Sequence, residues 1–247
     1  MTDACDACLR RSWLVARLAG CIELARHERR RLREILALSD DELLDGVAGD
    51  ARTSVAAELE ELEPDALREA SAAAELETVC RHGDAYPARL HDLVDPPASL
   101  WIAGGRRRLA ELAGGDLEEG PRAVAVVGTR QASPDGAEVA RALGRGLAVT
   151  GVTVVSGMAL GIDSAAHAGA LEGGGRTVAV LAGGADVPYP RRKAPLHREI
   201  GRAGCVVSEM PPGTGPFRWG FPARNRTCLA AKPQLTRGFA RRGDVSW

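Results

Sequence analysis

The stretch TVVSGMALGID, residues 153–163, decides the fold. A short run of mainly β-branched residues passes into a turn with Gly157 and Gly161 and ends in Asp163. The run is too short for a helix and predicts a buried strand. Turns of this kind often hold a phosphate, because small residues admit backbone N–H groups and a following helix N-terminus favours an anion. The rest of the chain must indicate which phosphate: that of a cofactor, a small substrate or a nucleic acid.

The same alternation of apolar strands and helices continues on both sides of this stretch. We expect strands at 123–127, 152–155, 177–182 and 205–208, and helices at 136–149, 163–171 and 194–203. Such strands form a parallel sheet that is covered on both faces, with right-handed crossovers. The sequence therefore predicts an α/β fold, a Rossmann-like doubly wound parallel sheet.

A small all-helical domain is expected ahead of the sheet. Residues 12–70 have apolar side chains at three- and four-residue spacing, and the helical character continues through the Ala-rich stretch 51–78. Ser39 and Glu42 have the spacing of a capping box, which predicts a helix start. A short strand is expected at 99–103, followed by a polar surface connection at 106–122.

The net charge of −1 conceals a division of the chain into two halves. Residues 1–120 hold 15 Arg and 25 Asp+Glu, a balance of −10, and residues 121–247 hold 17 Lys+Arg and 8 Asp+Glu, a balance of +9. A basic half is typical of proteins that bind polyanions. The alternative is that the acidic half only neutralises the basic half within the fold.

Composition favours a cytoplasmic protein that does not enter a membrane. No uninterrupted apolar run reaches the ~20 residues that a membrane span needs. The N-terminal residues MTDACDACLRR lack the apolar core of a signal peptide. Six cysteines scattered over 247 residues do not resemble a disulfide framework.

The ends of the predicted strands indicate an anion-binding rim. Ligands of open parallel sheets bind beyond the carboxyl ends of the strands, and three of the four ends here are small or glycine-rich. The dinucleotide fingerprint G-x-G-x-x-G is absent after the first strand, which continues as GTRQASPDG, residues 128–136. The mononucleotide pattern G-x-x-x-x-G-K-[ST] is absent too. We therefore expect neither NAD nor ATP, and no cofactor.

Two further features favour nucleic acid as the polyanion. Arg130 follows Gly-Thr at a strand end, where its guanidinium can grip a phosphate at two points; a salt bridge to a helix acid is the alternative. In PFRWGFPARNR, residues 216–226, three aromatic residues alternate with three arginines. Such a pattern is typical of single-strand binding, in which cations contact phosphates and rings stack on bases. The alternative is that rings such as Phe221 fill the core under a loop.

The chain resembles a known family, the DNA-processing protein A family (DprA/Smf). The resemblance rests on segments in the family's order and spacing, namely VAVVGTRQASPDG, VVSGMALGIDSAAHAGAL, GGRTVAVLAGGADVPYP, VVSEMPPGTGP and FPARNR, all within residues 122–226. It implies a helical N-terminal (SAM-like) domain at 1–75 and an extended Rossmann-like DNA-binding domain at 78–226. Residues 227–247 would form an atypical basic tail.

The resemblance also implies a function and a site. Members of the family bind single-stranded DNA without marked sequence preference, protect incoming DNA, and help load the RecA recombinase in natural transformation, commonly as homodimers and without catalysis or a cofactor. Asp163 is expected to cap its helix rather than touch phosphate. The DNA-binding residues carried over from the family's motifs are Gly128, Thr129, Arg130, Ser156, Gly157, Ala159, Gly161, Lys193, Arg224, Asn225 and Arg226.

The chain departs from the family's pattern after Arg226. The family continues there with an Ile- and Gly-rich segment, whereas this chain continues as TCLAAKPQLTRGFARRGDVSW, with no strand run and no helical periodicity. We hypothesise a frameshift or truncation after Arg226, which would leave the sheet domain incomplete. An inactive remnant is therefore one alternative function. Another is a phosphoribohydrolase-like nucleotide enzyme, although LAGGADVPYP lacks the glutamate of that family's PGGxGTxxE signature.

The remaining candidate groups have simple interpretations. Cys5 and Cys8 form half of a zinc knuckle, whose other ligands would be Cys21, or Cys80 with His82; reduced thiols without a metal are the favoured interpretation. His167 is expected to be a helix-packing or helix-capping histidine. Asp186 and Glu209 could form a carboxylate pair, but their spacing does not indicate that they face each other.

Overall fold

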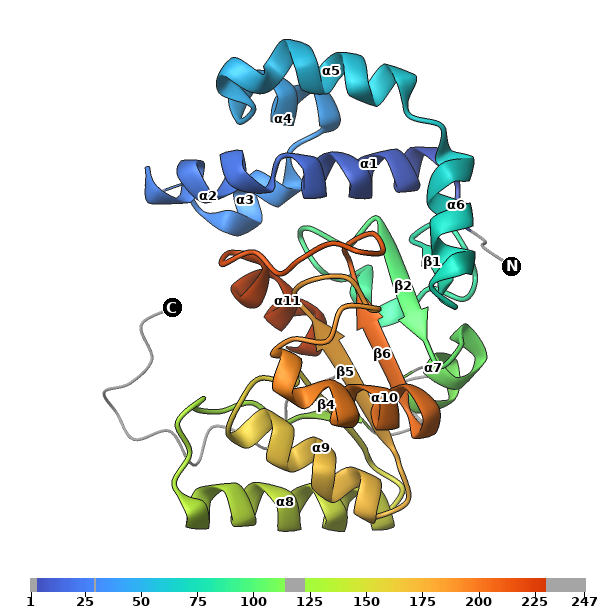
Figure 1. Ribbon diagram of the computed structural model, residues 1–247, viewed down its shortest axis with the longest axis vertical. Helices are drawn as coiled ribbons and strands as arrows, with labels where there is room; N and C mark the ends of the chain where they lie inside the picture. Colours follow the sequence, from blue (N-terminus) through green and yellow to red (C-terminus); the bar gives the residue numbers. More distant parts are fainter. Residues whose placement is uncertain (1–3, 29, 114–122, 230–247) are drawn as a thin grey trace.

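The computed structural model describes residues 4–28, 30–113 and 123–229 (Figure 1). A helical region lies at one end of a sheet that has helices on both faces, as the sequence predicts. The helices of this region are α1 (Asp6–Arg17), α2 (Ala19–His27), α3 (Leu32–Ala37), α4 (Asp40–Gly46), α5 (Arg52–Glu61) and α6 (Pro64–Ala73). None of the described helices is long and apolar enough to cross a bilayer.

Local sequence signals account for the starts of two of these helices. Ser39 Oγ accepts a hydrogen bond from Glu42 N at 3.2 Å, and the Glu42 carboxylate accepts one from Ser39 N at 2.8 Å, which confirms the capping box before α4. Pro64 opens α6, where its missing N–H costs no helical hydrogen bond.

The sheet has six strands in the order β1-β2-β6-β5-β4-β3. The strands are β1 (Glu77–Cys80), β2 (Ser99–Ala103), β3 (Ala123–Ala125), β4 (Thr153–Ser156), β5 (Thr177–Leu181) and β6 (Cys205–Ser208). The four strands β3 to β6 are parallel, as predicted, whereas β2 pairs with β6 and β1 pairs with β2 in the antiparallel sense. Strand β1 differs from the sequence-based expectation, since its first two residues fall in the stretch predicted to be helical.

Helices cover both faces of the sheet. One face carries α8 (Pro134–Val149), α9 (Ile162–Glu172) and α10 (Ala194–Ala203), which pack on Val154, Ala179 and Val206. The other face carries α7 (Arg106–Ala113), the short 3-10 helix η2 (Ala88–Leu90) and α11 (Gly220–Leu229).

Two expectations about these covering segments are wrong. Arg106–Arg108 begin α7 rather than lie in a loop. Residues 227–229 continue α11, so the segment after Arg226 begins as a helix. The rest of the atypical tail, residues 230–247, lies outside the described residues.

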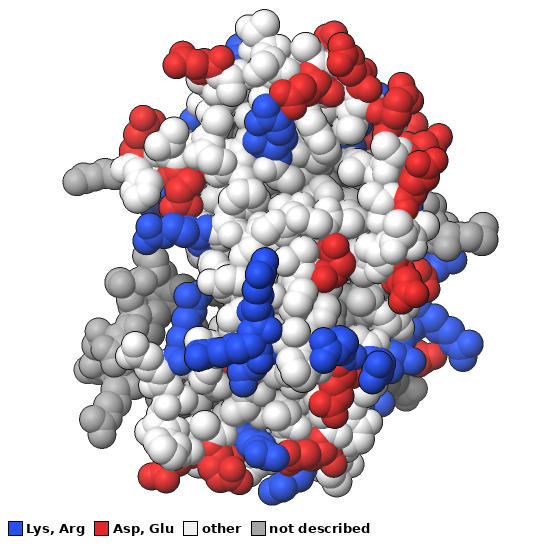
Figure 2. All heavy atoms as spheres, in the orientation of Figure 1, with Lys and Arg blue, Asp and Glu red and all other residues white. Residues whose placement is uncertain are grey.

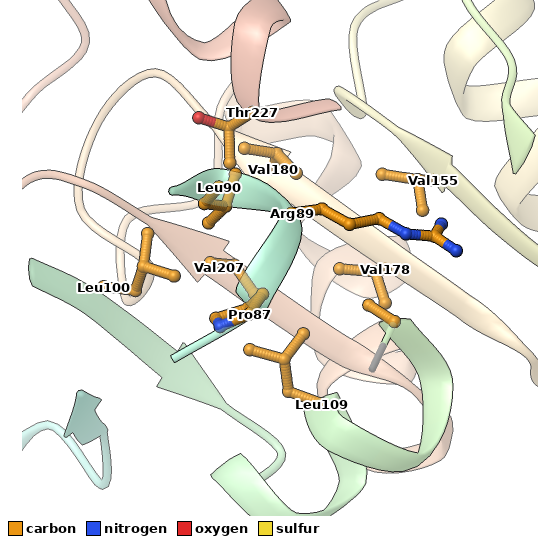
Figure 3. Close-up of a pocket in the computed structure, with 11 residues that line it drawn as sticks. Pro87, Arg89, Leu90, Leu100, Leu109, Val155, Val178, Val180, Val207 and Thr227 are labelled. Atoms are coloured by element: carbon orange, nitrogen blue, oxygen red, sulfur yellow. The ribbon is translucent and has the colours of Figure 1, made fainter. Parts of the chain in front are cut away.

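The second face of the sheet contains a small apolar hollow of about 50 Å³ (Figure 3). Figure 3 shows Val155, Val178, Val180 and Val207 of the strands turned toward it, with Arg89 extended past them. A lining made mainly of aliphatic side chains offers few hydrogen-bond donors to an anion, so we look for the candidate site elsewhere.

Two tryptophans join the helical region to the sheet. Trp219, which precedes α11, is fully buried among the side chains of the helical region, and its Nε1 donates to Ala19 O at 2.9 Å. Trp101 of β2 is also fully buried, and its Nε1 donates to Ser71 Oγ of α6 at 2.9 Å. Burial of two large rings across this boundary fixes the helical region against the end of the sheet.

Candidate nucleic-acid interface

The carboxyl ends of β3, β4 and β5 meet at one edge of the sheet, as parallel strands require. A hollow of about 80 Å³ opens there. Its lining includes Arg130, Gly157, Ala159, Tyr189 and Phe221. The structure thus brings together the turns after β3 and β4, which the sequence predicts to be parts of one site.

Arg130 is the exposed cation of this hollow. Its guanidinium carbon lies 4.6 Å from the centroid of the Phe221 ring, a cation–π contact. Tyr189, 47% exposed, has its ring centroid 5.6 Å from that of Phe221. No acid among the described residues forms an ion pair with Arg130, so the salt-bridge alternative is not realised in that part of the chain. Its charge therefore faces solvent beside two aromatic rings.

A carboxylate of the chain itself occupies the glycine turn. Asp163 accepts hydrogen bonds from Gly128 N at 3.3 Å and from Gly157 N at 3.2 Å, and so joins the turns after β3 and β4. The N-cap of α9 is Gly161, and Asp163 lies in the first turn, so the expectation that Asp163 caps this helix is wrong. Two amides of the predicted anion-binding rim already have an anion from within the chain.

Arg224 lies beneath the same turn. Its Nη1 donates to Val180 O at 2.6 Å, and its Nη2 lies 3.7 Å from the Asp163 carboxylate. Both side chains are nearly fully buried. Burial raises the pKa of Asp163 above its usual value, while Arg224 and the backbone amides oppose that rise.

Gly157 leaves the space that the buried Arg224 guanidinium occupies. A Cβ there would fall 1.4 Å from Arg224 Nη1, so any side chain would displace the guanidinium. Gly161 is required for a second reason: its φ is +78°, and a Cβ would lie 2.2 Å from Thr129 O. The two glycines of the opening stretch therefore serve close packing inside the turn.

Arg226 also turns inward. Its Nε donates to Asp95 Oδ2 at 2.8 Å and its Nη1 donates to Glu209 Oε1 at 2.5 Å. Thr227 Oγ1 donates to the same Glu209 oxygen. Arg226 thus ties the loop before β2 to the end of β6, and two acids neutralise its charge.

The other predicted contacts occupy different environments. Ser156 is buried and donates to Val126 O at 2.5 Å, which links β4 to the end of β3. Thr129 is exposed and accepts from Gln131 N. Asn225 is half-buried on α11, and Lys193 is half-buried at the end of the 3-10 helix η3 (Arg191–Lys193).

Of the aromatic residues in 216–226, Phe221 alone lines the hollow. Trp219, another of the three aromatic residues of this segment, is fully buried in the helical region and cannot stack on a base. Sequence reasoning missed Tyr189, which comes directly before Pro190 and η3. An aromatic residue shortly before Arg191 and Arg192 is the same ring-and-cation signal that drew attention to 216–226.

Basic residues gather on the face that carries η3 and α10. Figure 2 shows Lys and Arg across the middle of this face, and Asp and Glu along the outer side of the helical region. Arg191, Arg192 and Arg198 are exposed, and no acid within the described ranges forms an ion pair with them. Part of the basic half of the sequence therefore forms a basic surface on this face.

The other titratable candidates of the sequence analysis form hydrogen bonds with groups of the chain itself. Asp186 accepts from Gly213 N, and Glu209 accepts from Arg226 and Thr227, so each carboxylate has its own partners. His167 is fully buried against Thr177 Oγ1, at 2.6 Å from its Nδ1. Both Cys80 and His82 approach Cys5 and Cys8, whereas Cys21 Sγ donates to Ala48 O instead.

Relatives of known identity share the region of the sheet. The chain is 48% identical over 143 residues to a putative DNA processing protein DprA of Mycobacterium tuberculosis, an alignment that covers 58% of this chain and 35% of that protein. It is 41% identical over 143 residues to DNA processing protein DprA of Streptococcus pneumoniae, an alignment that covers 58% of this chain and 47% of that protein. The chain thus spans about a third to a half of the length of the curated relatives it matches.

Solved structures agree with this likeness. The X-ray structure of DprA from Streptococcus pneumoniae superposes with a TM-score of 0.63 at 28% identity, over 91% of this chain and 73% of that one. A Helicobacter pylori DprA structure, described by its single-stranded DNA binding mode, gives a TM-score of 0.54 at 29% identity, over 64% and 67%. The sequence profile of the family described as DNA recombination-mediator protein A matches residues 77–234. This chain therefore belongs to the DNA recombination-mediator protein A family.

Proposed function

We propose that this chain binds single-stranded DNA without sequence preference at the carboxyl edge of its sheet. The phosphates would cross Gly128–Arg130 and Gly157–Gly161. The observation that carries the proposal is Arg130, an exposed cation held against Phe221 at the mouth of the hollow.

Side chains rather than backbone amides would hold the phosphates. The amides of Gly128 and Gly157 are bonded to Asp163, and Ile162 N donates to Thr129 O. Arg130 forms no ion pair with any acid of the described ranges, and Lys193 follows at the start of α10, near the same edge. Neutralising phosphates with such cations releases counterions, which makes the binding salt-dependent.

The rings of Tyr189 and Phe221 would supply the contacts to bases. Tyr189 is partly exposed and tilted by 51° against Phe221, so a base can reach at least one ring face. Stacking contributes about 1–3 kcal/mol per base and accepts any base. The arrangement therefore suits binding without sequence preference.

The wider role rests on membership of the family. We propose that the chain protects incoming DNA, helps load the RecA recombinase during natural transformation, forms a homodimer and acts in the cytoplasm. The single-stranded DNA binding mode of the Helicobacter pylori protein supports the DNA ligand, and the family's description as a recombination mediator supports the recombinase role. We propose binding rather than catalysis, because the carboxylates weighed as a catalytic pair, Asp186 and Glu209, have separate partners.

Fluorescence anisotropy of a labelled oligothymidine over a salt series tests the DNA proposal. Arg130→Ala should weaken binding and flatten the slope of log K against log salt by about 1, because about one fewer counterion is released. Arg202→Ala is the matched control: Arg202 is also exposed, but it lies at the far end of α10, at the opposite edge of the sheet. An unchanged slope in Arg130→Ala would show that this residue makes no phosphate contact.

The recombinase proposal needs a separate assay. The chain should shorten the lag of RecA's DNA-dependent ATPase on single strands coated with single-strand binding protein. Arg130→Ala should lose this effect in proportion to its loss of DNA binding. A chain that binds DNA and leaves the lag unchanged would refute recombinase loading while leaving the DNA proposal intact.

A further inference from the structure

Four potential metal ligands converge where α1 meets β1. Cys5 is the N-cap of α1 and Cys8 lies in its first turn, while Cys80 ends β1 and His82 follows two residues later. The ligand atoms of all four lie within 4.8 Å of one another. The helix and the strand come from parts of the sequence more than 70 residues apart, so the fold itself assembles the cluster.

The spacing of these atoms fits a tetrahedral ion. His82 Nδ1 lies 3.4 Å from both Cys5 Sγ and Cys8 Sγ, and Cys5 Sγ lies 4.0 Å from Cys80 Sγ. A tetrahedral zinc with Zn–S distances of about 2.3 Å and Zn–N of about 2.0 Å separates sulfur atoms by about 3.8 Å and sulfur from nitrogen by about 3.5 Å. These three separations match such a site, and the other three are at most 4.8 Å, so small side-chain shifts would bring all four atoms to its corners.

We propose that Cys5, Cys8, Cys80 and His82 bind one structural Zn²⁺ ion. Three thiolates and one imidazole are a set that structural zinc sites use, and soft sulfur ligands disfavour magnesium and calcium. With four protein ligands the coordination sphere is closed, which is the mark of a structural rather than a catalytic zinc.

The position of two of the ligands on α1 favours thiolates. Both Cys5 and Cys8 lie at the N-terminus of α1, where the helix dipole favours negative charge. The backbone N–H of Cys5 points at Cys80 Sγ, 3.5 Å away, a contact that would orient a sulfur ligand. Cys8 and Cys80 are buried, while Cys5 and His82 lie at the surface, which gives the ion a path of entry.

The ion would fasten the helical region to the edge of the sheet. Metal ligation by α1 and by the end of β1 closes a loop that contains all the helices of that region. Since an unfolded chain does not hold the four ligands together, the free energy of zinc binding stabilises the folded state. None of the four ligands lines the hollow, so the proposal is independent of DNA binding.

Metal analysis of the full chain, purified from zinc-supplemented cells without chelators, tests the proposal. We expect about one equivalent of zinc per chain, and loss of it in Cys8→Ser and in His82→Ala. The Cys21→Ser variant is the matched control, because this half-buried cysteine lies outside the cluster; it should keep its zinc.

A second measurement keeps the test decisive if Cys8→Ser fails to fold. Co²⁺ added to the metal-free wild-type chain should give the visible absorption of tetrahedral cobalt with thiolate charge-transfer bands, and Zn²⁺ should displace them. A zinc chelator should lower the Tm of the wild-type chain and leave that of His82→Ala unchanged. A chain that takes up neither ion, or one isolated with a Cys5–Cys80 disulfide and no zinc, would overturn the proposal.

Discussion

At the residue scale, arginines that look alike in the sequence occupy different environments in the fold. Arg130 carries an exposed charge against Phe221, whereas Arg224 lies beneath Gly157 beside Asp163 and Arg226 is held by two acids. Removing the exposed arginine should affect ligand binding, because no acid among the described residues forms an ion pair with it. Removing a buried one should affect the fold, because its partner acid would remain buried without compensation.

Replacing Phe221 by leucine separates stacking from charge. Phe221→Leu should weaken oligothymidine binding by about 1–3 kcal/mol, because leucine offers no ring face to a base. The salt slope should stay near the wild-type value, since no phosphate contact is removed. Phe217→Leu is the matched control, because Phe217 packs against the helical region rather than the hollow. Equal losses in both variants would show that no base stacks on Phe221.

Replacing Arg224 by methionine tests the buried ion pair. Arg224→Met should lower the free energy of unfolding by about 3–5 kcal/mol, since the Asp163 carboxylate would stay buried without its cation. Urea denaturation followed by circular dichroism measures this loss. Adding Asp163→Asn should restore part of the stability, because the uncompensated charge is then gone. If the double variant loses as much unfolding free energy as the two single variants together, Arg224 and Asp163 are not coupled.

At the element scale, the packing of α9 against β4 and β5 depends on a neutral histidine. Thr177 Oγ1 donates to Val154 O, so it accepts from His167, and this assigns the imidazole proton to Nδ1. Nε2 is buried without a partner among the described residues. Burial, with the nearby Arg224 charge, lowers the pKa of His167 to about 3 from its ordinary value of 6.5.

This histidine makes stability depend on pH. Between 6.5 and about 3 the unfolded chain binds a proton that the folded chain does not. The contribution of His167 is therefore fully present above 6.5 and falls with decreasing pH by up to about 1.4 kcal/mol per pH unit. His167→Asn keeps a donor for Thr177 and should flatten that part of the profile in urea titrations. An equally steep profile in the variant would assign the acid sensitivity to other groups.

The sequence predicts well those elements whose signals are local. Short β-branched runs are sufficient to place β4, β5 and β6, and the Ser39–Glu42 spacing is sufficient to place the start of α4. Strand β1 has only four residues after an Ala-rich helix, and its pairing with β2 depends on a contact across the intervening loop.

The site is harder to predict because its partners are distant in the sequence. Nothing near Arg226 indicates Asp95, which lies 131 residues away, and nothing near Cys8 selects Cys80 with His82 over Cys21. The pattern of residues 216–226 predicts a binding segment, and one of its rings, Phe221, does line the hollow. It could not separate Phe221, at the hollow, from Trp219, in the core, because that depends on the path of the chain into α11.

At the scale of the whole molecule, the helical region and the sheet share one core. Met210, Trp219 and Ala223, from the end of the sheet and from α11, are buried in the same cluster as the helical side chains. Trp219 also donates its backbone N–H to Glu23 at 3.1 Å. The proposed zinc clamp at Cys5 and Cys80 would be a second fastening of the same two parts.

This shared core predicts that the two parts unfold together. The wild-type chain should show one transition in urea by circular dichroism. Trp219→Ala should lower the free energy of unfolding by about 3–5 kcal/mol, because the substitution opens a cavity between the two parts. Trp219→Phe should lower the free energy of unfolding by less. Its main loss is the hydrogen bond to Ala19 O, which contributes about 1 kcal/mol. The control is Trp13→Phe, since Trp13 is only half-buried on α1. Two separate transitions in the wild-type chain would mean that the helical region folds independently and that Trp219 only docks it.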